Sequence, residues 1–172
     1  SAIKGSSLDL SALNKSMNLL YEAHKDSLVS VALFSGDGKL ITAVPNSSEK
    51  RNRRVVEQDF FTSAVQQVEN LHFSLPHVQN LFNDPSFRTY WVISLSRVVE
   101  LSRSGVSSNG VLLVDMNFEN IERMMQKLNG EDKDRYFYLC DKQGNLIYHP
   151  RMREILRGEF QENTAEIGEW DD

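Results

Sequence analysis

The residue best placed to do chemistry is a carboxylate inside an apolar run. Asp115 follows Val111 to Val114 and precedes Met116. A carboxylate is costly to bury unless it is paired or hydrogen-bonded. We therefore expect one of two roles. Either Asp115 faces a ligand and accepts hydrogen bonds from an amine or a hydroxyl, or it ends a strand and accepts them from the amides of the next helix.

A second candidate group lies on a preceding strand. Residues two apart in a strand share a face, and four residues alternate in this way: Trp91, Ile93, Leu95 and Arg97. A pocket with Trp91 as a stacking wall and Arg97 as a donor to an anion or hydroxyl would suit a sugar or a small acid. The alternative is an exposed Arg97 with Trp91 in the core. Tyr90, Ser94 and Ser96 lie on the opposite face, so the two sets cannot line one pocket in a regular strand.

The histidines and the single cysteine give no metal or catalytic motif. His72 and His77 flank Pro76 without a cysteine or an HExxH pattern nearby, and a metal site needs more ligands. We expect His77 to be a polar group at a pocket rim and Cys140 to be an inert core thiol. The sequence contains no GxSxG, GxGxxG or P-loop motif. We therefore expect no enzyme activity, no cofactor and no bound metal.

The elements that position these residues are predicted from hydrophobic spacing and turn residues. Apolar residues three and four apart predict helices, and Asp-Gly between two apolar runs predicts a hairpin. The predicted elements are a helix over 8–25, a hairpin over 28–44, a polar basic loop over 45–54, a helix over 55–68, strands over 88–101 and 111–116 joined by a loop over 105–110, and a helix over 118–128. Phe60 and Phe61 lie in the second helix. This order predicts an α+β domain, an antiparallel sheet with helices packed on it.

A second hairpin repeats the pattern of the first. The sequence VALFSGDGKLITAV (31–44) matches FYLCDKQGNLIYHP (137–150) when Gly38 is set against Gly144. Both have four β-type residues, a turn, a glycine, a polar residue and Leu-Ile. This favours a duplicated module, with a first domain over 1–130 and a second over 131–172. The second offers two strands and a helix over 152–160, which cannot close a core well, so we expect it to be incomplete.

Composition limits the classes of partner. The chain has 172 residues, 25% of them charged, and a net charge of −5. Its last fourteen residues carry six acids and no base, which indicates a solvated end. An acidic chain is a poor nucleic-acid binder, so no nucleic-acid partner is expected. No apolar run reaches the roughly 18 residues of a spanning helix, so any membrane anchors of the parent protein are expected outside this chain.

The order of these segments resembles the double Cache family of PAS-like sensor domains, which lie outside bacterial membranes. The resemblance covers residues 8–150 and rests on six segments: SGDGKLI (35–41), QDFFTSAVQQ (58–67), FSLPHVQNLF (73–82), WVISLSRVV (91–99), GVLLVDMNFENIERMM (110–125) and YLCDKQGNLIYHP (138–150). Amino-acid-binding members have an Arg two residues before a Trp-Tyr pair. Gln58 and Phe60-Phe61 stand there instead, so recognition of an amino-acid carboxylate by that motif is not implied. Asp115 matches the final acid of the family pattern.

The resemblance implies the extracytoplasmic sensor of a membrane receptor, most simply a two-component sensor histidine kinase. A small molecule would bind in the membrane-distal module against six candidate residues: Asp115, Arg97, Trp91, His77, Phe60 and Phe61. The N-terminal helix, with its stripe of Leu10, Leu13, Met17 and Leu20, could also pair two subunits. Asp115→Ala and Arg97→Ala are both expected to abolish the response. The alternative is a cytosolic PAS- or GAF-like interaction module without a small ligand.

Overall fold

The computed structural model describes residues 10–50, 54–84, 86, 88–103, 105–132 and 134–164. The expected start of the first helix at 8–9, part of the basic loop and the acidic end from 165 onward lie outside the described residues. The chain divides into two compact units, residues 1–118 and 119–172. This division falls at the first residue of the third helix. The domain boundary at residue 130 stays a prediction.

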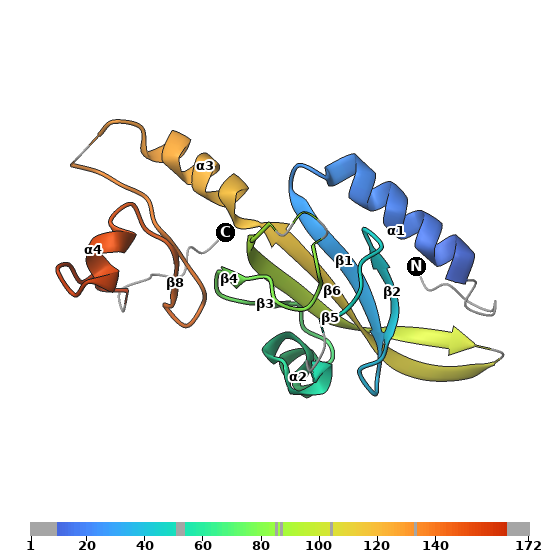
Figure 1. Ribbon diagram of the computed structural model, residues 1–172. Helices are drawn as coiled ribbons and strands as arrows, with labels where there is room; N and C mark the ends of the chain where they lie inside the picture. Colours follow the sequence, from blue (N-terminus) through green and yellow to red (C-terminus); the bar gives the residue numbers. More distant parts are fainter. Residues whose placement is uncertain are drawn as a thin grey trace, which may run out of the picture. The chain divides into compact units, whose positions relative to one another are not determined.

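The first unit is built on one antiparallel sheet (Figure 1). Its elements are α1 (Leu10–His24), β1 (Leu28–Ser35), β2 (Leu40–Val44), η1 (Val55–Glu57), α2 (Asp59–Gln66), β3 (His72–Phe73), β4 (His77–Val78), β5 (Trp91–Arg103) and β6 (Val106–Asn117). The strand order is β2-β1-β6-β5-β3, and β4 also pairs with β5. The predicted α+β class is therefore confirmed.

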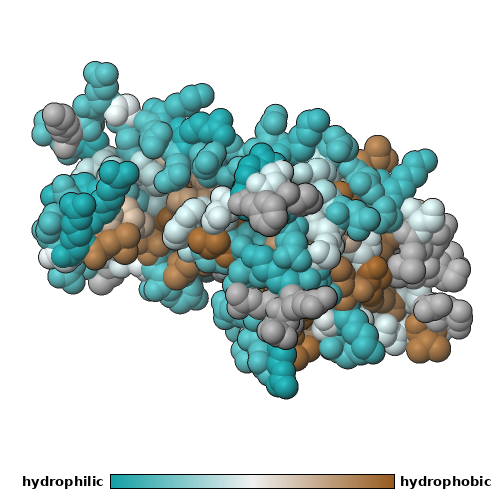
Figure 2. Space-filling model, in the orientation of Figure 1, coloured by the Kyte–Doolittle hydropathy of each residue, from teal (hydrophilic) through white to brown (hydrophobic). Residues whose placement is uncertain are grey.

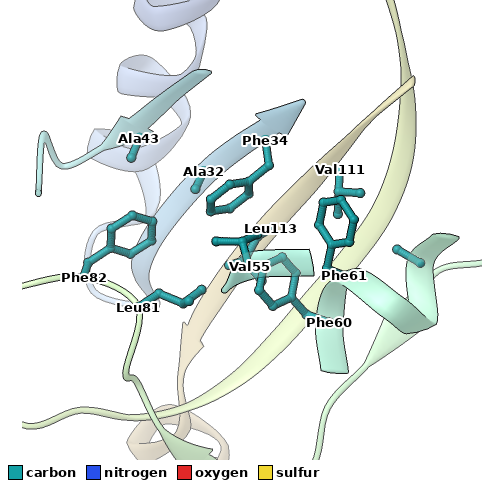
Figure 3. Close-up of a cluster of buried hydrophobic side chains, with 11 residues drawn as sticks. Ala32, Phe34, Ala43, Val55, Phe60, Phe61, Leu81, Phe82, Val111 and Leu113 are labelled. Carbon is teal, nitrogen blue, oxygen red and sulfur yellow. The ribbon is translucent and has the colours of Figure 1, made fainter. Parts of the chain in front are cut away.

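The two faces of this sheet carry separate apolar clusters. On one face, Phe60 and Phe61 of α2 point toward Phe34, Val111 and Leu113 of the sheet (Figure 3). On the other face, α1 covers β1 and β2. Three buried or partly buried side chains of this helix, Leu13, Met17 and Tyr21, pack against the sheet residues Val31, Val44, Leu112 and Val114. The helices thus lie on opposite sides of the sheet, and successive side chains of a strand point alternately to the two faces.

The β5–β6 hairpin is longer than predicted. The sequence placed a loop over 105–110, but the strands pair without interruption from Val92 opposite Asn117 to Arg103 opposite Val106. Gly110 lies within this ladder. A side chain would not fit there, because a Cβ would come within 2.6 Å of the Phe34 carbonyl oxygen and of a Leu101 methyl. The glycine marks a close approach of two strands and not a turn.

The second unit contains the rest of α3 (Phe118–Asn129), the short strands β7 (Leu139–Cys140) and β8 (Leu146–Tyr148), and α4 (Met152–Leu156). Helix α4 is shorter than the predicted 152–160. The turn of this hairpin repeats that of the first: Ser35 N donates to Lys39 O and Gly38 N to Ser35 O, just as Asp141 N donates to Asn145 O and Gly144 N to Asp141 O. Gly38 and Gly144 have φ of 82° and 85°, which explains a glycine at both positions.

Hydrophilic residues cover much of the face shown in Figure 2, with apolar side chains in smaller groups between them. Leu19 of α1 is 64% exposed and Trp91 of β5 is 54% exposed. Among the described residues, no helix combines the length and the apolar character needed to cross a bilayer.

Candidate functional site

The centre of the candidate site is a polar row that crosses three strands of the first unit. Asp115 of β6 is paired with Ser30 of β1 on one side and with Ser94 of β5 on the other. These three residues lie beyond Leu113 on the face that carries the α2 cluster. Asp115 is only 2% exposed, so the fold buries a carboxylate at the end of an otherwise apolar face.

Both oxygens of this carboxylate accept hydrogen bonds. Ser94 Oγ donates to Oδ1 at 2.5 Å, and Ser30 Oγ donates to Oδ2 at 3.2 Å. Burial nevertheless raises the pKa of Asp115 above its ordinary value, against the opposing effects of the Ser94 bond, the nearby His77 and the Ser30 bond. The groups around Asp115 therefore do not fully offset the cost of burying its negative charge, as is expected of a carboxylate that faces a ligand.

His77 reaches this row from β4, where it is paired with Val92 of β5. Its Nε2 lies 3.3 Å from Ser94 Oγ, and its Nδ1 lies 2.9 Å from the Leu75 carbonyl oxygen. Ser74 Oγ accepts a 2.8 Å bond from Ser94 N and lies 3.2 Å from His77 Nδ1. The imidazole is thus held at both nitrogens and joined to Asp115 through one hydroxyl.

A cavity of about 120 Å³ opens against these groups. It is lined by Gln58, Asp59, Phe60, Ser74, His77, Gln79, Asn80, Leu81, Ser94 and Asp115. A water molecule takes up about 30 Å³ in the liquid, so this volume suits a ligand of a few non-hydrogen atoms. Its lining offers two carboxylates, three amides and an imidazole, and neither Lys nor Arg is among these described residues. The site is thus suited to a compact donor-rich or cationic group.

The structure brings together only part of the predicted set. Asp115, His77 and Phe60 line the cavity, whereas Phe61 is part of the apolar cluster and not of the lining. Trp91 and Arg97 are exposed on the opposite face of β5. The reason is the register: Ser94 is paired with Asp115, so the odd-numbered residues of β5 point away from the cavity.

Sequence reasoning missed several lining groups. Ser94 and Ser96 were placed on the face opposite to Trp91, but nothing paired that face with Asp115 before the strand register was known. Ser96 Oγ donates to the Phe60 carbonyl at 2.8 Å and so ties α2 to β5. The amides of Gln58, Gln79 and Asn80 lie in loops or at a helix cap, where periodicity gives no signal.

A larger groove of about 1120 Å³ adjoins the cavity in the same unit, and Gln79 lines both. Its walls come from the end of α1, the start of β1 and the segments after β2 and β4, and include Ser30, Lys25, Lys50 and Tyr90. Within the described residues, no group of three or more His, Cys, Asp or Glu side chains could hold a metal ion.

No family model matches this chain, and no curated protein sequence matches it. Solved structures do. The ligand-binding domain of the Pseudomonas fluorescens chemoreceptor CtaA, in complex with L-valine, is similar over 83% of this chain and 58% of its own, with 15% identity and a TM-score of 0.61. The Pseudomonas aeruginosa PAO1 amino-acid chemoreceptor PctC, with GABA, is similar over 83% of this chain and 66% of its own, with 15% identity and a TM-score of 0.53.

The ligand-binding domain of PctB from the same organism, with L-arginine, is similar over 82% of this chain and 58% of its own, at 15% identity and a TM-score of 0.52. The chain spans less than two thirds of each of these domains. At this identity the likeness concerns the fold alone, and it confirms the predicted PAS-like arrangement of an antiparallel sheet with an N-terminal helix.

Proposed function

We propose that this chain is the extracytoplasmic ligand-sensing region of a membrane-bound signalling receptor of the double Cache type. The observation that carries the proposal is the buried Asp115 carboxylate, which lines a small polar cavity in a fold shared with chemoreceptor ligand-binding domains. A buried charge that is incompletely compensated is more typical of a functional site than of a structural core.

The proposed ligand is a small molecule that presents an amine or a hydroxyl to Asp115. The related CtaA and PctC domains were solved with L-valine and GABA, and both of these ligands carry an amino group and a carboxylate. In this chain the lining supplies acceptors for an amino group, but no Lys or Arg among the described lining residues for a carboxylate. The amine end therefore carries recognition in our proposal.

Two further parts of the proposal concern the parent protein. In our proposal the parent protein is a sensor histidine kinase, as the resemblance to the double Cache family implies. The chemoreceptor neighbours favour a chemotaxis receptor as the second candidate. Residues 131–172 belong to a second, membrane-proximal module in our proposal. A hydropathy profile of the gene tests the location: apolar segments of about 20 residues on both sides support it, and their absence supports the cytosolic interaction module.

A homodimer through the N-terminal helix completes the proposal. Leu13 and Met17 pack on the sheet, whereas Leu20 remains 47% exposed and Leu19 64% exposed. These two leucines are free to meet a second helix. Sedimentation velocity of the chain and of Leu20→Glu is expected to show a concentration-dependent dimer that the variant loses, and a chain that stays monomeric at all concentrations would contradict the dimer.

Calorimetric titration of small amines, amino acids and polyols against the chain tests the binding site. Asp115→Asn is expected to weaken the best ligand by roughly 10- to 100-fold, because a hydrogen bond to a charged group contributes about 1.5–3 kcal/mol. Arg97→Ala is the matched comparison. The sequence alone predicted that this variant loses the response. The structure predicts unchanged ligand affinity, because Arg97 is exposed on the opposite face of the sheet. Loss of affinity in Arg97→Ala but not in Asp115→Asn would overturn the proposed site.

A further inference from the structure

The hydrogen bonds around Ser94 can be counted. With an ionised Asp115 and a neutral His77, these contacts require one more donated proton than the three side chains carry. The Leu75 carbonyl is an acceptor only, so the 2.9 Å contact requires a proton on His77 Nδ1. In neutral histidine the other nitrogen, Nε2, is then an acceptor. Ser94 Oγ lies 3.3 Å from this Nε2 and 2.5 Å from Asp115 Oδ1, and its hydroxyl has one proton to donate.

With an ionised Asp115 and a neutral His77, Ser94 faces two acceptors and can satisfy only one of them. Adding one proton resolves the conflict in either of two ways. The proton lies on His77 Nε2, which donates to Ser94 while Ser94 donates to the carboxylate. Otherwise it lies on Asp115, which donates to Ser94 while Ser94 donates to Nε2. The two forms differ only by proton shifts along the Asp115–Ser94–His77 chain.

We propose that the ligand-free site holds this one shared proton and releases it to solvent when the ammonium group of a small ligand binds to Asp115. The inference rests on the proposed function, since it concerns the same cavity. An ammonium group donates to the ionised carboxylate, so a proton on Asp115 must leave. A proton on His77 is expelled as well, because it would place a second positive charge beside the first. Ligand affinity therefore rises with pH until the proton is absent from the free site.

The other groups around the carboxylate do not supply this proton. Ser30 from β1 donates to Oδ2 and does not titrate. From α2, Asp59 lines the same cavity and is exposed. Tyr90, just before β5, lines the adjoining groove, where burial raises the pKa of its hydroxyl. Among the described residues that line the cavity, His77 is thus the one group that could become a cation.

The test uses three compact probes of the wild-type chain: ethanolamine, the isosteric but uncharged ethylene glycol, and L-alanine. Titration calorimetry is run at one pH in phosphate and in HEPES, which has no primary amine. The different ionisation enthalpies of the two buffers report the protons exchanged. Ethanolamine is expected to bind with release of close to one proton. Ethylene glycol is expected to release none, and L-alanine is expected to bind no better than ethanolamine.

Two variants test the shared proton. His77→Gln replaces the imidazole with an amide that can donate to Ser94 without a titrating proton, so that Ser94 can donate to the ionised Asp115. It is expected to bring proton release from about one to well under half. His72→Gln is the matched control, because His72 lies on the adjacent β3, contacts the Gln67 carbonyl and does not line the cavity. Its proton release is expected to equal that of the wild type, and circular dichroism verifies that each variant is folded.

The outcomes separate this inference from the proposed function. Ethanolamine binding without proton release, or with full release in His77→Gln, overturns the inference and leaves the sensor proposal standing. Binding of ethylene glycol but not ethanolamine overturns the inference, because no ammonium group is then needed. Binding of L-alanine but not ethanolamine also overturns it, because the carboxylate of alanine would then carry recognition. Absence of binding by all three probes contradicts the inference and counts against a small-molecule site in this cavity.

Discussion

At the scale of single residues, the molecule is defined by where it buries polar side chains. Asp115 is nearly inaccessible to solvent yet lines a cavity, and three elements, β1, β4 and β5, bring hydroxyl or imidazole groups to it. The sequence identified Asp115 because an acid in an apolar run is conspicuous. It could not identify Ser30 and Ser94, because a serine in a strand is ordinary until the register sets it against a carboxylate.

The buried carboxyl gives stability a definite dependence on pH. Because burial raises the folded-state pKa of Asp115 above its ordinary 3.8, its contribution is complete below about pH 4 and is lost as pH rises through the folded-state value. Asn at this position does not titrate. The free energy of unfolding of the wild type relative to Asp115→Asn is therefore expected to fall as pH rises, measured by urea unfolding with tryptophan fluorescence.

Asp37→Asn in the same unit is the control with the opposite sign. Hydrogen bonds from Ser35 and Lys39 lower the pKa of Asp37, so its contribution is present above its ordinary value and lost as pH falls. Parallel pH profiles for wild type and Asp115→Asn would show that the carboxyl is not destabilised by burial.

A hydrogen-bonded cluster around the buried His149, in the second unit, makes its own prediction. His149 Nε2 lies 2.8 Å from Glu162 Oε2, and the same oxygen accepts a 2.6 Å bond from the Tyr136 hydroxyl. Tyr136→Phe is expected to weaken this unit by about 1 kcal/mol, seen as faster hydrogen exchange of the β7–β8 amides. The effect should vanish in acid, because the Tyr136 and His149 bonds hold the pKa of Glu162 below its ordinary 4.5 and their contribution is lost as pH falls through that lowered value.

Tyr138→Phe is a matched comparison for this cluster. Tyr138 also contacts the His149 ring, with centroids 5.6 Å apart, but no hydrogen bond of its hydroxyl occurs within the described residues. Equal effects of the two substitutions would show that ring packing, and not the bond to Glu162, carries the contribution of Tyr136.

At the scale of elements, the position of α2 sets the cavity wall. Phe60 and Phe61 are adjacent in sequence but differ in role: Phe60 lines the cavity, while Phe61 contributes to the apolar cluster (Figure 3). Truncation of either ring is expected to cost about 1–2 kcal/mol of stability. Only Phe60→Leu is expected to change ligand affinity, measured by calorimetry beside the urea unfolding of both variants. A larger change in affinity from Phe61→Leu would contradict this assignment.

Most of these elements could be predicted from the sequence because their signals are local. The β1–β2 and β7–β8 hairpins follow from turn residues, and both turns have the predicted glycine at positive φ. The exact length of the β5–β6 hairpin could not be predicted. Gly110 and the serines around it are typical of a loop, and the approach of Phe34 that requires this glycine is a contact between distant segments.

At the scale of the whole molecule, the chain is a compact first unit followed by a shorter second one. The α+β class and the PAS-like arrangement were predictable, because they follow from the order of helices and hairpins. The composition of the site was only partly predictable. Trp91 and Arg97 share a strand with Ser94, and which of the two faces meets Asp115 depends on one register choice that local patterns do not contain.

The measurement that tests the central claim most directly is a map of backbone amide shifts on addition of ethanolamine, L-alanine or ethylene glycol to the isotope-labelled chain. The account predicts that a bound probe moves the amides of Ser30, His77, Ser94 and Asp115 together, and that these shifts are lost in Asp115→Asn. Shifts confined to the opposite face around Trp91 and Arg97, or no shift with any probe, would contradict a sensor site built on Asp115.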